Sequence, residues 1–222
     1  MDNLSAGIIS EWIQGKLTGS GNAMVNKIST DTRTLEKGNL FIALRGERTD
    51  GHKYISNAFE KGASVVVCET PVTPPEGCAV ITVEDTIKAL KDMAKKYMEK
   101  FRIPVIGITG SVGKTTTKEM IAQILSTEYN VHKTMGNFNN HIGLPLSVLE
   151  LTREHTAAVF EMGMSGLGEI EYLADIIKPD IGVITNIGIS HIEKLGTRQN
   201  ILRAKLEITR GMNENGKLIL NG

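Results

Sequence analysis

The sequence predicts an α/β protein in two parts. Over residues 102–222 we expect a mostly parallel sheet with helices on both faces, because strand-sized apolar runs alternate there with helical stretches. A glycine-rich phosphate-loop pattern between the first strand and the first helix of this part supports the same fold. Over residues 1–101, shorter strands and helices predict a small N-terminal α/β domain, and 222 residues are enough for two domains.

The composition excludes several classes of protein. Hydrophobic residues make up 41% and charged residues 23%, which argues against a disordered, collagen-like or coiled-coil chain. The 25 basic and 25 acidic side chains balance in both halves, so no nucleic-acid partner is expected. We see no secretory signal and no apolar run of the roughly 18 residues that membrane insertion requires. Cys68 and Cys78 are predicted to be buried thiols, which favours a cytoplasmic protein.

The N-terminal part is predicted to contain three strands and three helices. The strands are the β-rich runs at 40–44, 64–68 and 79–83. The helices cover part of 1–22, then 52–61 and 85–101, and residues 19–22 form a loose Gly-rich stretch. Asp85 can cap the last of these helices. We place the domain boundary at the end of that helix, after Phe101.

The second part alternates regularly. Strands are predicted at 103–109, 156–162, 181–186 and 217–221, and helices at 114–128, 169–177 and 198–212. Because the sequence stops directly after its last strand, without a closing helix, we expect an incomplete domain from a longer protein.

A phosphate loop is the strongest signal in the sequence, and it makes the second part a P-loop ATPase-type domain. Gly110 and Gly113 allow backbone N–H groups to point at phosphate oxygens, and the helix that follows adds its positive dipole end. Lys114 is expected to reach the terminal phosphates and Thr115 to bind Mg²⁺. The loop is a shortened variant, because Ile108 stands where the general pattern has its first glycine. The predicted cofactor-binding residues here are Thr109, Gly110, Ser111, Val112, Gly113, Lys114, Thr115 and Thr116.

Further polar residues follow the other strands. Glu161 ends one predicted strand, Asn186 ends the next, and His191 lies just beyond it. Ligands of open parallel sheets bind at the carboxyl ends of the strands, so these residues and the phosphate loop are expected to share one crevice. The asparagine-rich segment 134–143 is either a turn stabilised by side-chain amides or a ligand-binding loop.

Several blocks, in this order, resemble the Mur ligase family. They are residues 29–33, 38–44, 50–52, 109–116, 136–145, 161–164 with 168–170, 185–188 with His191, and 203–205. The resemblance covers nearly the whole chain, and the similarity is greatest to the branch that adds D-alanyl-D-alanine to UDP-N-acetylmuramoyl-tripeptide. It implies an N-terminal UDP-substrate-binding domain (1–101), a truncated central ATP-binding domain (102–222) and an absent C-terminal domain.

The resemblance also implies a reaction and a set of site residues. ATP would phosphorylate a carboxylate to an acyl phosphate, which the amine of D-alanyl-D-alanine would attack, with two Mg²⁺ ions bound. Family positions assign Lys114, Glu161, His191 and Lys205 to catalysis and Thr115, Glu161, His191 and Lys205 to metal binding, with Lys205 carbamylated. Asn137 and Asn140 match positions near the phosphates, and Ser29, Asp31 and Arg33 match the uridine-nucleotide loop. A monomer is expected.

Three alternatives remain open from sequence alone. One is a ligase of the same kind with another substrate, either another Mur ligase or a folylpolyglutamate synthase-like enzyme. Another is a P-loop switch or motor NTPase, which leaves the N-terminal domain unexplained. The third is a fragment that binds a UDP-sugar and catalyses nothing.

Overall fold

The computed structural model describes residues 4–46 and 49–221. Residue contacts divide the chain into two compact units, Met1–Lys96 and Tyr97–Gly222. This division falls inside one helix, slightly before the boundary expected after Phe101, and the domain assignment stays a prediction. No helix in the described ranges is long and apolar enough to cross a membrane.

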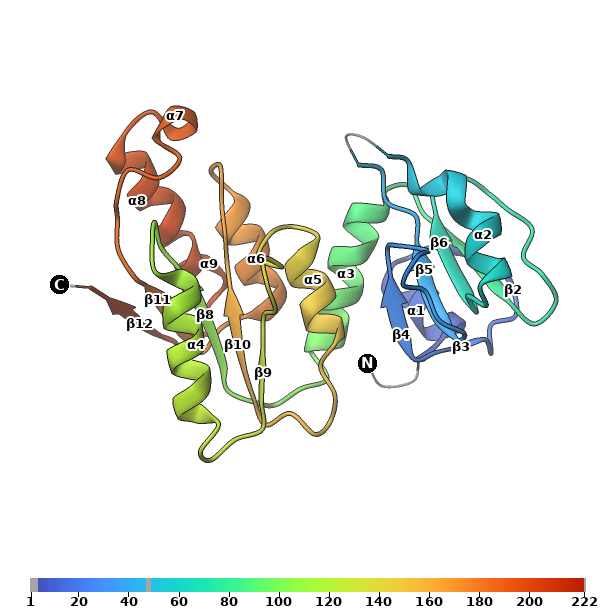
Figure 1. The fold of residues 1–222 in the computed structure, drawn as a ribbon, viewed down its shortest axis with the longest axis horizontal. Helices are drawn as coiled ribbons and strands as arrows, with labels where there is room; N and C mark the ends of the chain where they lie inside the picture. The colour runs from blue at the N-terminus through green and yellow to red at the C-terminus, as the bar shows by residue number, and fades with distance from the viewer. Residues whose placement is uncertain (1–3, 47–48, 222) are drawn as a thin grey trace. The chain divides into compact units, whose positions relative to one another are not determined.

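The N-terminal unit is built on a five-stranded sheet (Figure 1). Its strand order is β2 (Lys16–Gly19), β7 (Ala79–Thr82), β6 (Val65–Cys68), β5 (Asn39–Ile42) and β4 (Lys27–Ser29). Neighbouring strands are parallel except β2, which runs antiparallel to β7. A small antiparallel ribbon joins β1 (Leu4–Ser5) to β3 (Met24–Val25). The helical elements are α1 (Ala6–Trp12), the 3₁₀ helix η1 (Gly51–Tyr54), α2 (Ile55–Glu60) and α3 (Thr86–Met98).

The predicted elements of this unit are present, but the edge strands β2 and β4 and the two ribbon strands β1 and β3 were missed. The central strands β5, β6 and β7 are almost wholly buried, which is why their apolar runs predicted them. Strand β2 is mostly exposed, so it has no such run. The predicted loose stretch 19–22 is irregular or turn over its last three residues, and only Gly19 belongs to β2. Asp85 caps α3 as predicted, with its Oδ1 accepting the N–H groups of Ile87 (2.8 Å) and Lys88 (3.0 Å).

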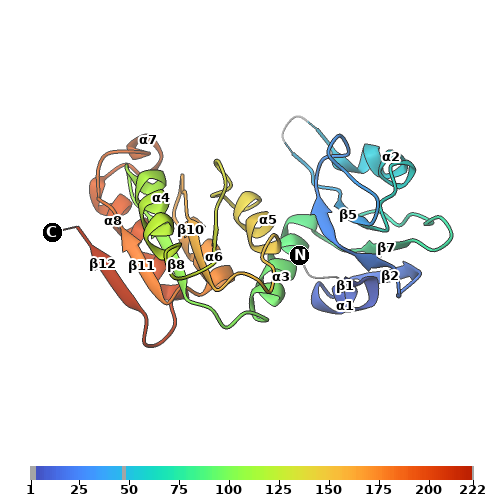
Figure 2. The ribbon, with the colours of Figure 1, turned by 60° about the horizontal axis from the view of Figure 1, so that its bottom comes forward.

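The second unit has a five-stranded sheet in which every pair of neighbours is parallel. Its order is β12 (Lys217–Leu220), β11 (Ile181–Ile184), β8 (Val105–Thr109), β10 (Ala157–Glu161) and β9 (Val131–Lys133). Figure 2 shows β12 at one edge of this sheet. The helices are α4 (Lys114–Leu125), α5 (Gly143–Leu149), α6 (Glu169–Ile177), α7 (Ile192–Leu195), α8 (Arg198–Leu206) and α9 (Ile208–Gly211).

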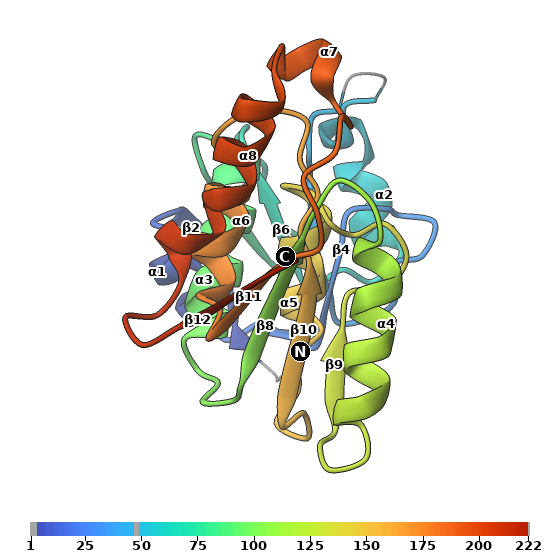
Figure 3. The ribbon, with the colours of Figure 1, turned by 90° about the vertical axis from the view of Figure 1, so that its left-hand side faces the viewer.

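Helices cover both faces of this sheet, as predicted (Figure 3). On one face, Ala122 of α4 packs with Ile106, Ile108 and Val159. On the other face, glycines allow close approach of the helices. A Cβ on Gly211 of α9 would collide with Ala174 of α6, so the two helices meet at a glycine.

Three helical features differ from the expectation. The predicted helix 198–212 is two helices, α8 and α9, separated at Glu207. Helix α5 was not predicted, because it opens with Gly143 and contains Pro145, which are residues typical of turns. Helix α7 is a single short turn and was also missed. Cys68 and Cys78 are free thiols as predicted, although Cys78 is only partly buried.

Candidate functional site

The loop between β8 and α4 requires its two glycines. A Cβ on Gly110 would collide with the hydroxyl of Thr185 from the neighbouring strand end, so no larger residue fits there. Gly113 has φ +80°, a left-handed conformation that favours glycine, and it immediately precedes the first residue of α4. Strand register brings Glu161 of β10 beside Ile108 of β8, so the strand ends lie together at this edge.

The first turn of α4 presents open hydrogen-bond donors. The first helical bond runs from Thr117 N–H to the Gly113 carbonyl (2.9 Å). In the described part of the chain, the N–H groups of Gly113, Lys114, Thr115 and Thr116 have no acceptor. Because such groups carry the positive end of the helix dipole, this turn suits a phosphate group.

Two side-chain oxygens that could bind a metal ion lie together beside this turn. The Thr115 hydroxyl donates to Oε2 of Glu161 over 2.8 Å, and the Glu161 side chain is buried, with only 3% of the residue exposed. Hydroxyl and carboxylate oxygens are the ligands that Mg²⁺ prefers. Lys114 Nζ donates to the Gly110 carbonyl at 3.0 Å, so the lysine folds back over the loop. The residues present therefore fit a Mg²⁺–phosphate group.

Glu161 is held by a network that sequence reasoning missed. Asn139 Nδ2 donates to its Oε1 (2.8 Å), and its own N–H donates to the Thr134 hydroxyl (3.0 Å). The carbonyl of Thr134 accepts from Lys118 Nζ (2.6 Å), a lysine only 1% exposed. The only signal for these contacts was the clustering of asparagines, which did not show which amide faces the carboxylate.

Asn137 and Asn140, which were predicted to lie near the phosphates, form hydrogen bonds with the backbone of their own segment. Asn140 Oδ1 accepts the N–H groups of Ile142 (3.1 Å) and Gly143 (2.8 Å), so it stabilises the start of α5. Asn137 is exposed, and its carbonyl accepts the N–H of Asn139 (2.7 Å). Their predicted contacts with a nucleotide stay predictions.

Lys205 is a buried amine next to this site. It lies on α8 and is only 2% exposed, and its side-chain amine makes no hydrogen bond or ion pair with the residues that the structure describes. Burial, reinforced by the positive charge of Lys114, lowers the pKa of Lys205 to about 8. A substantial fraction of its amine is therefore neutral near physiological pH.

His191 is not joined to this group by any described contact. It precedes α7 with φ +64°, a left-handed conformation that is uncommon for a residue with a side chain. Among the residues described, no group of three or more His, Cys, Asp or Glu side chains is placed to hold a metal ion. The metal roles predicted for His191 and Lys205 stay predictions.

The predicted uridine loop, residues 29–33, lies in the N-terminal unit and forms several hydrogen bonds within itself, and Lys61 Nζ donates to its Thr32 carbonyl (2.6 Å). The Ser29 hydroxyl accepts the Asp31 N–H (3.1 Å) and donates to the Asp31 carbonyl (2.9 Å). Arg33 forms a two-pronged ion pair with Asp31, with Nε at 2.9 Å and the terminal nitrogen at 2.6 Å. This pair lowers the pKa of Asp31 to about 2, while 86% of the Arg33 side chain stays exposed.

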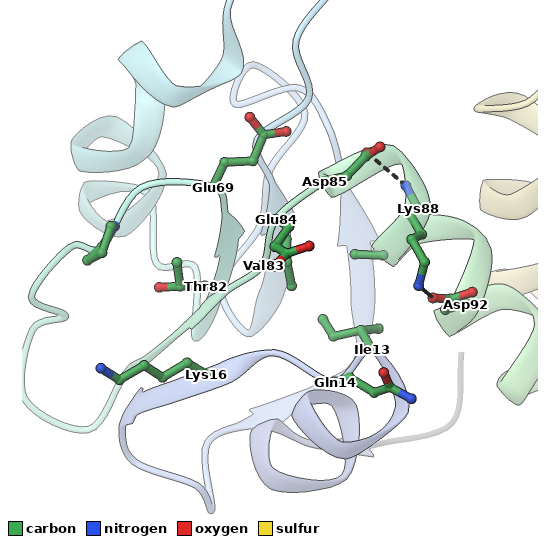
Figure 4. A pocket seen from close by; sticks show the side chains of 12 residues that line it. Ile13, Gln14, Lys16, Glu69, Thr82, Val83, Glu84, Asp85, Lys88 and Asp92 are labelled. Carbon is green, nitrogen blue, oxygen red and sulfur yellow. Dashed lines mark hydrogen bonds and ion pairs between the residues drawn. The ribbon is translucent and has the colours of Figure 1, made fainter.

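The N-terminal unit also carries a cavity of about 580 Å³ (Figure 4). Its acidic lining includes Glu84, Asp85 and Asp92, and Lys88 pairs with Asp92 at 2.6 Å. None of the predicted site residues lines this cavity.

A strand, a glycine loop and a helix with open N–H groups, set beside a buried carboxylate, define a P-loop nucleotide-binding protein of the α/β class. Family profiles then identify the particular group. The profile "Mur ligase middle domain" matches residues 108–222, and "Mur ligase family, catalytic domain" matches residues 24–107. The chain belongs to the Mur ligase family, as the sequence blocks indicated.

Curated relatives and solved structures agree with this assignment. The chain is 51% identical over 217 residues to UDP-N-acetylmuramoyl-tripeptide–D-alanyl-D-alanine ligase of Bacillus subtilis, covering 96% of the chain and 48% of that protein. A crystal structure of MurF from Acinetobacter baumannii matches with a TM-score of 0.92 and 36% identity, over 99% of this chain and 49% of that one. MurF from Thermotoga maritima in complex with ADP matches with a TM-score of 0.82 and 34% identity, over 88% and 45%. The chain spans about half the length of the curated relatives it matches.

Proposed function

We propose that the whole protein is an ATP-dependent ligase that joins D-alanyl-D-alanine to UDP-N-acetylmuramoyl-tripeptide in peptidoglycan precursor synthesis. The observation that carries the proposal is the Thr115–Glu161 contact beside the open N–H groups of the α4 first turn. The relatives named above carry that activity in their names, and one of the structural relatives holds ADP. These relatives favour this substrate over those of the other ligases, and they favour a ligase over a switch or motor NTPase.

The reaction has two steps in this proposal. An oxygen of the tripeptide carboxylate attacks the γ-phosphorus of ATP, ADP leaves, and an acyl phosphate forms. The dipeptide amine then attacks the acyl carbon, phosphate leaves as the amide bond forms, and the amine nitrogen releases a proton. Both steps move negative charge among phosphoryl oxygens, so the protein acts mainly by positioning and by supplying positive charge.

Different residues of the site would bind the phosphates and the metal ion. The N–H groups of residues 113–116 and the Lys114 ammonium bind and orient the phosphates. Thr115 and Glu161 would hold Mg²⁺, which neutralises phosphoryl charge when bound. Asn139 keeps the Glu161 carboxylate turned toward Thr115 through its 2.8 Å contact.

Lys205 is proposed to be carbamylated and, with His191, to take part in a second Mg²⁺ site. Its neutral amine adds to CO₂ to give a carbamate and release a proton. The lowered pKa of about 8 supports this, because only the neutral amine reacts. A carbamate would also convert a costly buried ammonium into an oxygen ligand.

Three further statements complete the proposal. The loop of Ser29, Asp31 and Arg33 contacts the uridine nucleotide, which needs a donor such as the exposed guanidinium. The protein is cytoplasmic, a location that the free thiols of Cys68 and Cys78 favour. It acts as a monomer.

The test is product formation by the whole protein. We expect phosphate release from ATP only when UDP-N-acetylmuramoyl-tripeptide and D-alanyl-D-alanine are both present. A Lys114→Met variant serves as the inactive control for contaminating ATPases. Phosphate release that is indifferent to both substrates would contradict the proposal.

A further inference from the structure

The centre of the phosphate loop is bonded to the segment that follows β11. Val112 N–H donates to the side-chain Oδ1 of Asn186 (3.1 Å), and Asn186 Nδ2 donates to the Val112 carbonyl (3.0 Å). The Thr185 hydroxyl donates to the same carbonyl (2.6 Å). Both backbone polar groups of Val112 are thereby satisfied, although 63% of the residue is exposed.

Ser111 is held by the same segment. Its N–H donates to the Asn186 carbonyl (3.2 Å), and its hydroxyl accepts the N–H of Gly188 (2.9 Å). Its carbonyl accepts from the hydroxyl of Ser190 (3.3 Å). Hydrogen bonds with residues 185–190 therefore hold Ser111 and Val112 of the phosphate loop in place.

These bonds divide the phosphate loop into two halves. The N–H groups of Ser111 and Val112 are already satisfied within the protein, so a phosphate gains little by replacing their acceptors. The N–H groups of residues 113–116 have no acceptor among the described residues. Phosphate binding therefore depends on the second half, and its position depends on how the first half is held.

We propose that Asn186 is a positioning residue for nucleotide binding. Its side-chain amide forms hydrogen bonds with both the N–H and the carbonyl of Val112, a contact that we call the clamp, and thereby fixes the direction of the N–H groups of residues 113–116. An amide is needed because it offers a donor and an acceptor at once. A carboxylate of the same shape would lose the donor and face the Val112 carbonyl with a negative charge. His191 lies five residues further on, so the clamp also ties the phosphate loop to the segment that carries His191.

The first experiment measures amide hydrogen exchange, resolved to single residues, in the whole protein with and without Mg²⁺ and ADP. Without nucleotide, we expect the Val112 amide to be protected and the amides of residues 113–116 to exchange quickly. With ADP, the amides of 113–116 become protected and Val112 is unchanged. A Val112 amide that gains protection only when ADP binds would overturn the clamp.

The second experiment measures ADP affinity in variants. Asn186→Asp and Asn186→Ala are expected to weaken ADP binding by about tenfold, and Asn186→Ala to expose the Val112 amide. Asn130→Asp is the matched control, because Asn130 also bonds a backbone carbonyl, that of Glu154 (3.0 Å), before β9 and away from the phosphate loop. It should leave ADP affinity unchanged. Equal affinity in the Asn186 variants and the control would contradict the clamp.

The clamp rests on the proposed function only for the identity of the bound nucleotide, and the two can fail separately. A protein that shows the expected exchange pattern but forms no ligation product supports the clamp and contradicts the ligase proposal. A protein that forms the product with Val112 unprotected overturns the clamp alone. If the Asn186 variants do not fold, the exchange pattern of the unmodified protein decides.

Discussion

The phosphate loop, residues 109–116, and the predicted uridine loop, residues 29–33, differ in how their polar groups are satisfied. Other segments hold the phosphate loop through Asn186 and Glu161, and four of its N–H groups have no acceptor among residues 4–46 and 49–221. In the uridine loop the exposed Asp31–Arg33 ion pair forms within the loop, and an outside contact, from Lys61 Nζ to the Thr32 carbonyl (2.6 Å), holds it. The first loop is therefore preformed for an anion, whereas Arg33 must share or exchange its carboxylate partner when a ligand binds.

The largest loss of activity is expected when Glu161, the carboxylate beside the phosphate loop, is replaced. Glu161→Gln keeps the shape of the side chain but removes the charge that would hold Mg²⁺. We expect ligase activity of the whole protein to fall by about a hundredfold or more, with a higher Mg²⁺ requirement. Activity measured over a Mg²⁺ titration tests this. Glu128→Gln, an exposed carboxylate after α4, should leave activity unchanged, and equal activity in both variants would contradict the role of Glu161.

The next largest effect is a loss of stability in acid, which we expect in the second unit because of His132. Burial lowers the pKa of His132 to about 4, so the folded protein keeps this side chain neutral down to about that pH. Below pH 6.5 the unfolded chain binds a proton that the folded chain does not, and stability therefore falls as the pH drops toward 4. We expect a loss of about 2 to 3 kcal/mol between pH 7.5 and pH 4.5. Asp31, with a pKa of about 2, does not titrate in this window.

Urea unfolding of the 222-residue chain at the two pH values tests this expectation. Trp12, the single tryptophan, reports the N-terminal unit, and circular dichroism reports both units. His132→Gln retains a polar partner for Ser147, which His132 contacts at 3.2 Å, and should reduce the acid sensitivity. An acid sensitivity equal to that of the unmodified chain would exclude His132 as its source.

A smaller effect is expected in the uridine loop. Arg33→Ala removes a charge-assisted donor and should weaken binding of the UDP-tripeptide by about tenfold in the whole protein. The same change should leave thermal stability nearly unchanged, because the ion pair is exposed. Calorimetric titration with the UDP-tripeptide measures the affinity, with Arg102→Ala as the exposed-arginine control. Unchanged affinity would remove the loop from the site.

The smallest effect concerns the cap of α3. Asp85→Ala should lower the free energy of unfolding by about 1 kcal/mol, because two N–H groups lose their acceptor. Asp92→Ala on the same helix removes the partly exposed pair with Lys88 and should cost less than about 0.5 kcal/mol. Urea unfolding measures both, and a larger loss in the Asp92 variant would contradict the cap.

The sequence predicted what depends on local pattern. Strands β8, β10 and β11 are buried apolar runs, and Glu161 could be placed because it directly follows such a run. The sequence did not predict contacts between distant segments. Asn139, rather than Asn137 or Asn140, faces Glu161 because of the turn conformation before α5, and no local pattern reveals that conformation. The Asn186 contact likewise depends on strand register.

A crystal structure of the whole protein with Mg²⁺ and a non-hydrolysable ATP analogue tests the central claim most directly. The account predicts a Mg²⁺ ion bound by the Thr115 hydroxyl and the Glu161 carboxylate, with phosphate oxygens on the N–H groups of residues 113–116. A metal–nucleotide complex bound away from Thr115 and Glu161 would contradict it.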